Sequence, residues 1–179
     1  MAGDTIGIQE YLESYVPSLV GKRLAEKPVP DMEGTVFTLQ VTIKGEKTLV
    51  FGITIKDARE IAVTPGGIEN PTLEVTLTED FIRPLVDLAG SFTGRKQYDA
   101  ASQARGTVEF EIGMPGNWVM PVSVKFNGAS EPSLRIAGSS ADLAKIATGE
   151  LNGPTAFMQG KIKMEGDMAF GLSLSNIFM

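Results

Sequence analysis

The side chains best suited to chemistry in this sequence are four carboxylates, Asp80, Asp142, Glu165 and Asp167. Two carboxylates can work together as general acid and general base, but one of them then needs a raised pKa. Asp80 and Asp142 come at the expected starts of helices, and Asp167 precedes an apolar segment. Capping of free backbone N–H groups explains all three positions. We therefore expect no catalytic residue among them.

A stretch from Gly153 to Lys161 superficially suggests a phosphate-binding loop. Its glycines are too far apart, and Ile162 stands where such a loop has the Ser or Thr that holds magnesium. The chain also has no His and no Cys. This composition excludes Ser-His-Asp chemistry, cysteine nucleophiles, disulfides and most zinc sites. We expect no cofactor and no bound metal.

Composition describes a globular protein that does not bind polyanions. The 179 residues are 42% hydrophobic and 21% charged, with a formal charge of −6. Nucleic acids and anionic membranes attract clusters of Lys and Arg, and the sequence has none. The N-terminal residues do not form a secretory signal, and no apolar run approaches the roughly 20 residues that span a bilayer. We expect a cytoplasmic protein without nucleic-acid partners or stable membrane insertion.

The elements that must position these residues begin with a helix. Apolar residues spaced by three and four predict a helix from about Gly7 to Val20, which Pro17 bends or weakens near its end. A stiff linker with Pro28 and Pro30 follows it, so residues 1–33 form a helix and linker. From Gly34 the apolar period changes to two, which predicts a hairpin and two further strands at 36–43, 48–56, 60–64 and 71–77.

A helix after Asp80 is expected to have a separate or kinked first turn, because Pro84 interrupts it. Residues 91–104 form a polar joint, either a loop or a short helix. A second hairpin is predicted at 107–112 and 118–126, with Pro121 placing its second strand at an edge or a bulge. The strand and helix around Pro71 and Asp80 parallel those around Pro132 and Asp142. This similarity indicates either a degenerate repeat or two instances of a common unit.

The C-terminal stretch carries the largest apolar surface. After a short strand at 161–165, Gly166-Asp167 ends the strand and precedes an apolar segment that ends at Phe178. Its Met and Phe side chains are compatible with a closed core or with a pliable cavity, because Met adapts to varied ligand shapes. Gly171 and the alternation of apolar residues allow a strand as well as a helix there.

The C-terminal part of the chain resembles the sterol carrier protein 2 (SCP2) family. The matching residues are Asp142 and the apolar segment ending at Gly149, Ala156-Phe157, Gln159-Gly160-Lys161 and Gly166-Asp167-Met168. The resemblance is close from about residue 132 onward and looser before it. It implies an SCP2-like α+β fold, a mostly antiparallel sheet with helices on one face and an apolar cavity between them. Residues 34–179 would form this domain in one compact unit, with 89–130 as an insertion.

The resemblance also implies that the last apolar segment and the helix before it line the cavity. The expected lipid-binding residues are Phe81, Leu85, Leu143, Ile146, Phe157, Met158, Gln159, Met164, Met168, Phe170, Leu172, Leu174, Ile177 and Phe178. Gln159 and Asn152 would either orient a ligand head group or satisfy backbone groups of turns.

These observations favour non-catalytic binding, and transfer, of a lipid such as a fatty acid, a fatty acyl thioester or a sterol. Two alternatives stay open. One is a module for protein interaction or homodimerisation, or an accessory subunit of a lipid-metabolising enzyme. The other is an enzyme subunit that uses Asp, Glu, Lys or Tyr.

Overall fold

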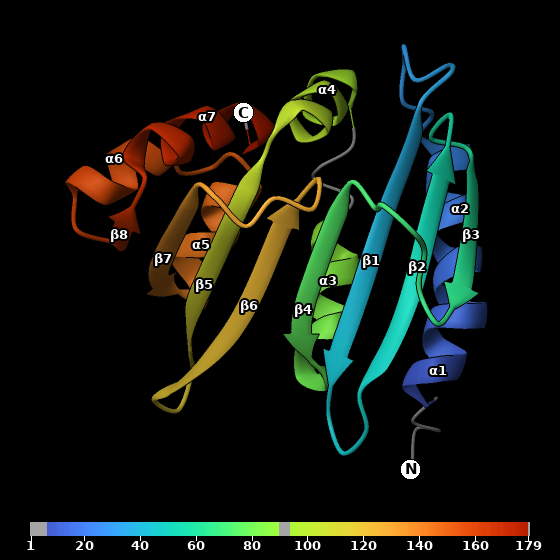
Figure 1. Cartoon of the computed structure of the whole chain (residues 1–179), viewed down its shortest axis with the longest axis horizontal. Helices are drawn as coiled ribbons and strands as arrows, with labels where there is room; N and C mark the ends of the chain where they lie inside the picture. The colour runs from blue at the N-terminus through green and yellow to red at the C-terminus, as the bar shows by residue number, and fades with distance from the viewer. Residues whose placement is uncertain (1–6, 90–93, 179) are drawn as a thin grey trace.

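The computed structural model of the chain describes residues 7–89 and 94–178. Its centre is an eight-stranded sheet with the order β3-β2-β1-β4-β6-β5-β7-β8 (Figure 1). Strands β1 and β4 are parallel, as are β5 and β7, and the other neighbours are antiparallel. The structure therefore confirms the expected α+β fold with a mostly antiparallel sheet.

The strands lie close to where the period-two pattern places them. Their bounds are β1 (Val36–Lys44), β2 (Leu49–Lys56), β3 (Glu60–Pro65), β4 (Leu73–Thr78), β5 (Gly106–Met114), β6 (Trp118–Phe126), β7 (Ser133–Ser139) and β8 (Ile162–Gly166). The helices are α1 (Ile8–Glu10), α2 (Val16–Glu26), α3 (Ile82–Ala89), α4 (Arg95–Gln103), α5 (Ser140–Ala147), α6 (Gly153–Met158) and α7 (Met168–Phe178). No helix in the described ranges is long and apolar enough to cross a bilayer.

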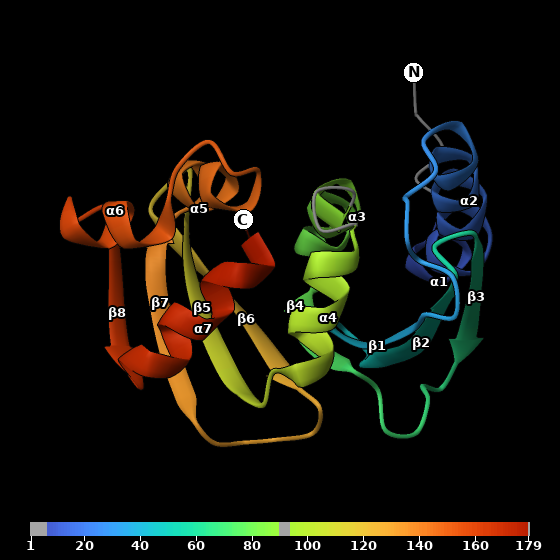
Figure 2. The same ribbon diagram turned by 90° about the horizontal axis from the view of Figure 1, so that it is seen from above.

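The two faces of the sheet differ in chemistry. Along β1, Leu39, Val41 and Ile43 point to one face, and strand pairing places Val75 on that same face. We call this the inner face. The helices lie on this one side of the curved sheet (Figure 2). The opposite, outer face is mostly polar, with Thr38, Gln40, Thr42 and their cross-strand neighbours, and no helix of the described ranges covers it (Figure 2).

The two halves of the sheet repeat one topology. In the first half, β1 pairs antiparallel with β2 and parallel with β4. In the second, β5 pairs antiparallel with β6 and parallel with β7. A helical segment follows each of the strands β4 and β7. The similarity between residues around Pro71 and around Pro132 thus coincides with equivalent strands, and pairing of β4 with β6 joins the halves.

The N-terminal helical segment is longer than its apolar spacing predicts and runs from Ile8 to Glu26. A π-helical turn (Tyr11–Tyr15) joins α1 to α2, and Pro17 lies within the first two residues of α2. After β4, a 3-10 turn (Glu79–Phe81) precedes α3, as the position of Pro84 predicts. The polar joint contains α4, so it is a short helix.

Pro121 lies inside the sheet and not at its edge, because β6 has β4 on one side and β5 on the other. The pairing of β6 with β4 covers only Ser123 to Phe126. Pro121 therefore has a strand partner only on the β5 side, at Glu111. The missing N–H of proline costs no ladder hydrogen bond with β4 at this position.

The last apolar segment is a helix, which decides between the two alternatives for residues 168–178. Asp167 caps it, because its Oδ1 atom accepts a hydrogen bond from the Phe170 N–H at 2.8 Å. Gly171 allows close contact with the sheet, since a Cβ there would lie 2.7 Å from Met164 Cε and 3.0 Å from Leu134 Cδ2. Glycine has a low helix propensity, and this close approach explains why a glycine lies inside α7.

Candidate functional site

Two groups of buried side chains fill the space between the sheet and the helices. The first core cluster lies under the N-terminal helices and α3 and comprises Tyr11, Leu12, Val16, Val41, Ile43, Phe51, Ile53, Val75, Leu77, Ile82, Val86, Ile112, Met120 and Val122. The second core cluster lies under α4 and α7 and comprises Ala101, Val108, Phe126, Leu134, Phe170, Leu174 and Ile177.

A diagonal row of half-buried apolar side chains crosses the inner face between these clusters. Its members are Leu39 on β1, Leu73 on β4, Val124 on β6, Phe110 on β5, Ile136 on β7 and Met164 on β8. Leu39 pairs with Leu73, Phe110 with Ile136, and Ile136 with Met164. Val124 is a diagonal neighbour of Leu73, because Leu73 pairs with Phe126, two residues after Val124. It is also a diagonal neighbour of Phe110, because Phe110 pairs with Val122, two residues before Val124. The row is therefore continuous.

The position of the diagonal row distinguishes it from the two clusters. Phe110 and Val124 contact both of them, so they mark the boundary. An apolar side chain on the covered face of a sheet normally loses its solvent contact. One that keeps part of its surface accessible borders space that protein atoms do not fill. With neighbouring strands about 4.8 Å apart, the five steps from β1 to β8 span about 24 Å.

Five of the expected site residues are half-buried. Phe81, Leu85 and Leu143 are half-buried and contact the first core cluster from the helices. Met164 belongs to the diagonal row itself and contacts the second cluster. Ile146, on α5, is also half-buried. These five residues come from three separate segments of the chain.

Other expected site residues lie elsewhere. Phe170, Leu174 and Ile177 are buried in the second core cluster and lie on one side of α7. On the outer surfaces of α6 and α7, Phe157 is 40% exposed, Met158 85%, Met168 38% and Leu172 60%. Gln159 is exposed at the end of α6. The side chain of Phe178 lies outside the described residues.

The position of α7 is fixed by contacts at its first turn. A Cβ on Gly106 would lie 2.6 Å from Phe170 Cζ, so the Phe170 ring lies directly against the glycine backbone. The same ring meets Phe126 edge to face, with centroids 6.4 Å apart. These contacts hold the helix over the start of β5 and one border of the diagonal row.

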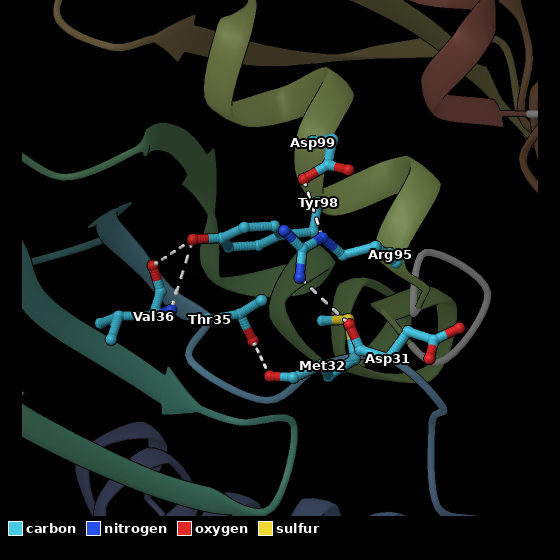
Figure 3. A network of polar contacts seen from close by, with 7 residues as sticks. All are labelled: Asp31, Met32, Thr35, Val36, Arg95, Tyr98 and Asp99. Carbon is cyan, nitrogen blue, oxygen red and sulfur yellow. Dashed lines mark hydrogen bonds and ion pairs between the residues drawn. The ribbon is translucent and has the colours of Figure 1, made fainter.

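The neighbouring helix α4 contacts α7 and is connected to both halves of the sheet. At its C-terminal end, the amide of Asn127 donates to the backbone carbonyls of Ala101, Ser102 and Ala104 at 3.1, 3.1 and 2.7 Å. At its N-terminal end, Arg95 donates to the carbonyl of Asp31 at 3.2 Å (Figure 3).

Two further contacts complete the polar network at the N-terminal end of α4. Arg95 pairs with Asp99 at 3.0 Å, four residues along the helix. The Tyr98 hydroxyl lies 3.4 Å from both the backbone N and the backbone O of Val36 (Figure 3). The Tyr98 ring also contacts a small third cluster formed by Leu24, Met32 and Ala58. Helix α4 thus bridges the linker, β1 and the second half of the sheet.

A surface hollow of about 260 Å³ lies at the linker before β1. Its lining residues are Pro28, Val29, Pro30, Asp31, Met32, Glu33, Asp57 and Arg59. None of the residues expected at the lipid site is among them. Its lining is charged on several sides, in contrast to the apolar diagonal row.

The four carboxylates have structural or exposed positions. Asp142 is the third residue of α5 and exchanges hydrogen bonds with the N-cap Ser139, whose Oγ accepts from the Asp142 N–H at 3.1 Å. The cap of α5 is therefore Ser139, not Asp142 itself. Asp80 and Glu165 are exposed. The expected capping role of Asp80 is wrong, because Asp80 lies inside the 3-10 turn and Thr78 occupies the N-cap position. Asn152 caps α6 by accepting from the Thr155 N–H at 3.1 Å, the backbone role expected as one of two alternatives.

Sequence reasoning missed the strand members of the diagonal row other than Met164. Leu39, Leu73, Phe110, Val124 and Ile136 have the same alternating pattern as their buried neighbours. The pattern marks them as inward-facing, but it carries no signal for their remaining exposure. That exposure depends on where the helices lie.

Comparison with known proteins connects the second half of this structure to a family. A family model described as the SCP-2 sterol transfer family matches residues 91–179. Sterol carrier protein 2 of Gallus gallus is 34% identical over 70 residues, which are 36% of this chain and 13% of that protein. Hydroxysteroid dehydrogenase-like protein 2 of Xenopus tropicalis is 31% identical over 87 residues, 44% of this chain and 21% of that protein. The chain spans only a small part of these relatives.

Among solved structures, the sterol carrier protein domain 2 of Helicoverpa armigera is similar, with a TM-score of 0.34 and 23% identity over 55% of this chain and 76% of that chain. The family match takes in α4 through α7. It includes residues 91–130, which are nearly all of the stretch 89–130 that the sequence predicts as an insertion. It contains four members of the diagonal row, Phe110, Val124, Ile136 and Met164. The C-terminal half of the chain, residues 91–179, therefore belongs to the SCP-2 sterol transfer family.

Proposed function

We propose that this protein binds the apolar part of a lipid along the diagonal row and performs no chemistry on it. The observation that carries the proposal is the continuous line of half-buried apolar side chains between two closed core clusters. A fatty acid or a fatty acyl thioester fits its length and its lack of charge. A sterol is the other ligand class that the family name suggests.

Burial of apolar surface supplies the binding energy in this proposal. Each methylene group removed from water contributes about 0.8 kcal/mol, so a long acyl chain needs few polar contacts. Members of the diagonal row carry no charge that would pair with a carboxylate. The head group therefore stays at the surface, and affinity rises with chain length.

Transfer of the bound lipid between donor and acceptor is the activity that such a site serves best. The carboxylates support a non-catalytic role, because Asp167 accepts a backbone hydrogen bond at the start of α7 and Asp142 accepts one from the Ser139 hydroxyl at the start of α5. A bound lipid would leave unchanged, by the route through which it entered.

The direct test is titration with a fluorescent long-chain fatty acid. We expect saturable binding of about one molecule per chain, displaced by long-chain lipids and not by short ones. Val124→Phe places a larger side chain in the middle of the diagonal row and should abolish this binding while the protein stays folded. Binding that is unchanged in Val124→Phe would refute the assignment of the site.

Val108 provides a matched control, because it pairs with Val124 on the neighbouring strand and is 1% exposed. Val108→Phe overfills a closed core and should lower the free energy of unfolding by about 1–3 kcal/mol. Val124→Phe should cost less, since it enters open space. Equal destabilisation by the two variants would mean that Val124 belongs to the core.

The alternative of a docking or dimerisation module is favoured by one observation, the exposed apolar side chains of α6 and α7. Replacing Met158 and Leu172 by Ser tests it without touching the diagonal row. If the native chain is a dimer by light scattering and the double variant is a monomer that still binds fatty acid, both surfaces are functional. A native chain that is already monomeric removes the dimer.

A further inference from the structure

The turn between β5 and β6 carries exposed apolar side chains. Residues 115–119 are all exposed, and among them Trp118 is 44% and Val119 58% accessible. From Ile112 to Val124 the sequence contains no charged residue, in a chain that is 21% charged. Figure 1 shows this hairpin extending to the lower end of the sheet. The protein therefore presents an uncharged tip to its surroundings.

The repeated topology supplies a comparison within the same molecule. The β1–β2 hairpin is the counterpart of β5–β6, and its tip carries Lys44, Glu46 and Lys47. The second tip needs only Gly116 and Asn117, at φ values of 92° and 61°, to make its turn. Turn geometry thus does not require Trp118 and Val119 to be apolar. Exposed Trp and Val at a strand end also lack the charges that usually protect such a position.

We propose that the β5–β6 tip inserts into the interface of an electrically neutral lipid bilayer. Tryptophan prefers this interface because its ring is apolar while its N–H can still reach water. The net charge of −6 and the absence of a basic cluster match a zwitterionic surface and not an anionic one. The tip is too short to span the bilayer, so the contact is reversible.

This docking goes beyond binding of a single lipid molecule and connects to it through β5 and β6. Phe110 and Val124, on the same two strands, belong to the diagonal row. Met114 at the tip lies four positions after Phe110 along β5, about 14 Å at about 3.4 Å per residue. A bilayer that holds the tip therefore lies close to the proposed lipid site, although Trp118 and Val119 are not part of that site.

The experiment uses the single tryptophan of the chain as its own probe. Phosphatidylcholine vesicles should shift the Trp118 emission to the blue and protect it from acrylamide, and added salt should not reverse the effect. Val119→Ser keeps the probe and should weaken vesicle binding about tenfold, the factor for one buried valine. Its affinity for free fatty acid should stay unchanged, which separates docking from lipid binding.

A control probe is available at the charged tip. In a Trp118→Phe background, Lys47→Trp places the indole on the β1–β2 hairpin, where vesicles should not shift its emission. Unchanged Trp118 emission with vesicles, or equal shifts at the two tips, would overturn the proposal. A shift that follows phosphatidylserine content, or protein concentration without vesicles, would also overturn it, in favour of an anionic surface or a second copy.

Discussion

The ring of Phe170 lies against the backbone of Gly106, where a Cβ would come within 2.6 Å of Phe170 Cζ and 2.5 Å of the Pro132 carbonyl oxygen. Gly106 also has a φ of 142°, which side chains rarely adopt. This contact joins the start of β5 to the first turn of α7. It places two requirements on one residue, since its backbone takes a positive φ and the helix approaches it closely.

Gly106→Ala should therefore destabilise the protein. Overfilling of this contact and backbone strain together predict a loss of about 1–3 kcal/mol in the free energy of unfolding. Urea denaturation measures this loss. Gly21→Ala is the control, because Gly21 lies inside α2 and, apart from the adjoining helix backbone and chain neighbours, no described atom lies within 4 Å of the added methyl group. It should gain up to about 1 kcal/mol from helix propensity. A Gly106→Ala variant as stable as the native protein would contradict the contact.

Two neighbouring residues of α7 should respond very differently to truncation. Phe170 is 6% exposed in the second core cluster, while Leu172 is 60% exposed. Phe170→Ala should cost about 3–5 kcal/mol, whereas Leu172→Ala should stay within about 0.5 kcal/mol of the native protein. Chemical denaturation of both variants checks this. Similar small losses would show that α7 is a loosely held lid and not a part of the core.

Residues 168–178 also show how far the sequence predicts the structure. The strands were predictable, because alternation of apolar residues is a local signal. The state of α7 was not, since Met168, Phe170, Leu172 and Leu174 alternate while Phe170, Leu174 and Ile177 recur at helical spacing. The close packing of Gly171 on Leu134 and Met164, which explains the glycine in this helix, is a long-range contact that no local pattern reveals.

The candidate site was predictable only in part for the same reason. Met164 could be named because the SCP2 resemblance points to the C-terminal segments. Leu39 and Val41 have the same pattern, yet one is half-buried and the other 1% exposed. The difference arises from the division of the helices into two groups over one sheet, a property of the whole fold.

The side-chain amide of Asn127 should be required for the stability of the protein. It has a φ of 50°, and its side chain donates to three backbone carbonyls at the end of α4. Asn127→Asp replaces the donor by an acceptor that faces those carbonyls, so it should lower the free energy of unfolding by about 1–3 kcal/mol. Asn117→Asp, at a φ of 61° on the exposed hairpin tip, is the matched control and should be nearly neutral. Equal stability of the two variants would show that the Asn127 bonds contribute nothing.

The last prediction concerns the boundary of the family match. A fragment of residues 91–179 keeps α4 to α7 but loses β4, the partner of β6 from Ser123 to Phe126. Its inner face would expose Val124 and Phe126 beside an unpaired strand edge, and such edges pair with other chains. We expect the fragment to aggregate or to self-associate through β6 in size-exclusion chromatography. Co-expression with residues 1–90 should restore a monodisperse complex, because β4 then covers β6. A fragment that is monomeric and unfolds cooperatively in urea would show that the C-terminal half folds alone, against the single compact domain expected from the sequence.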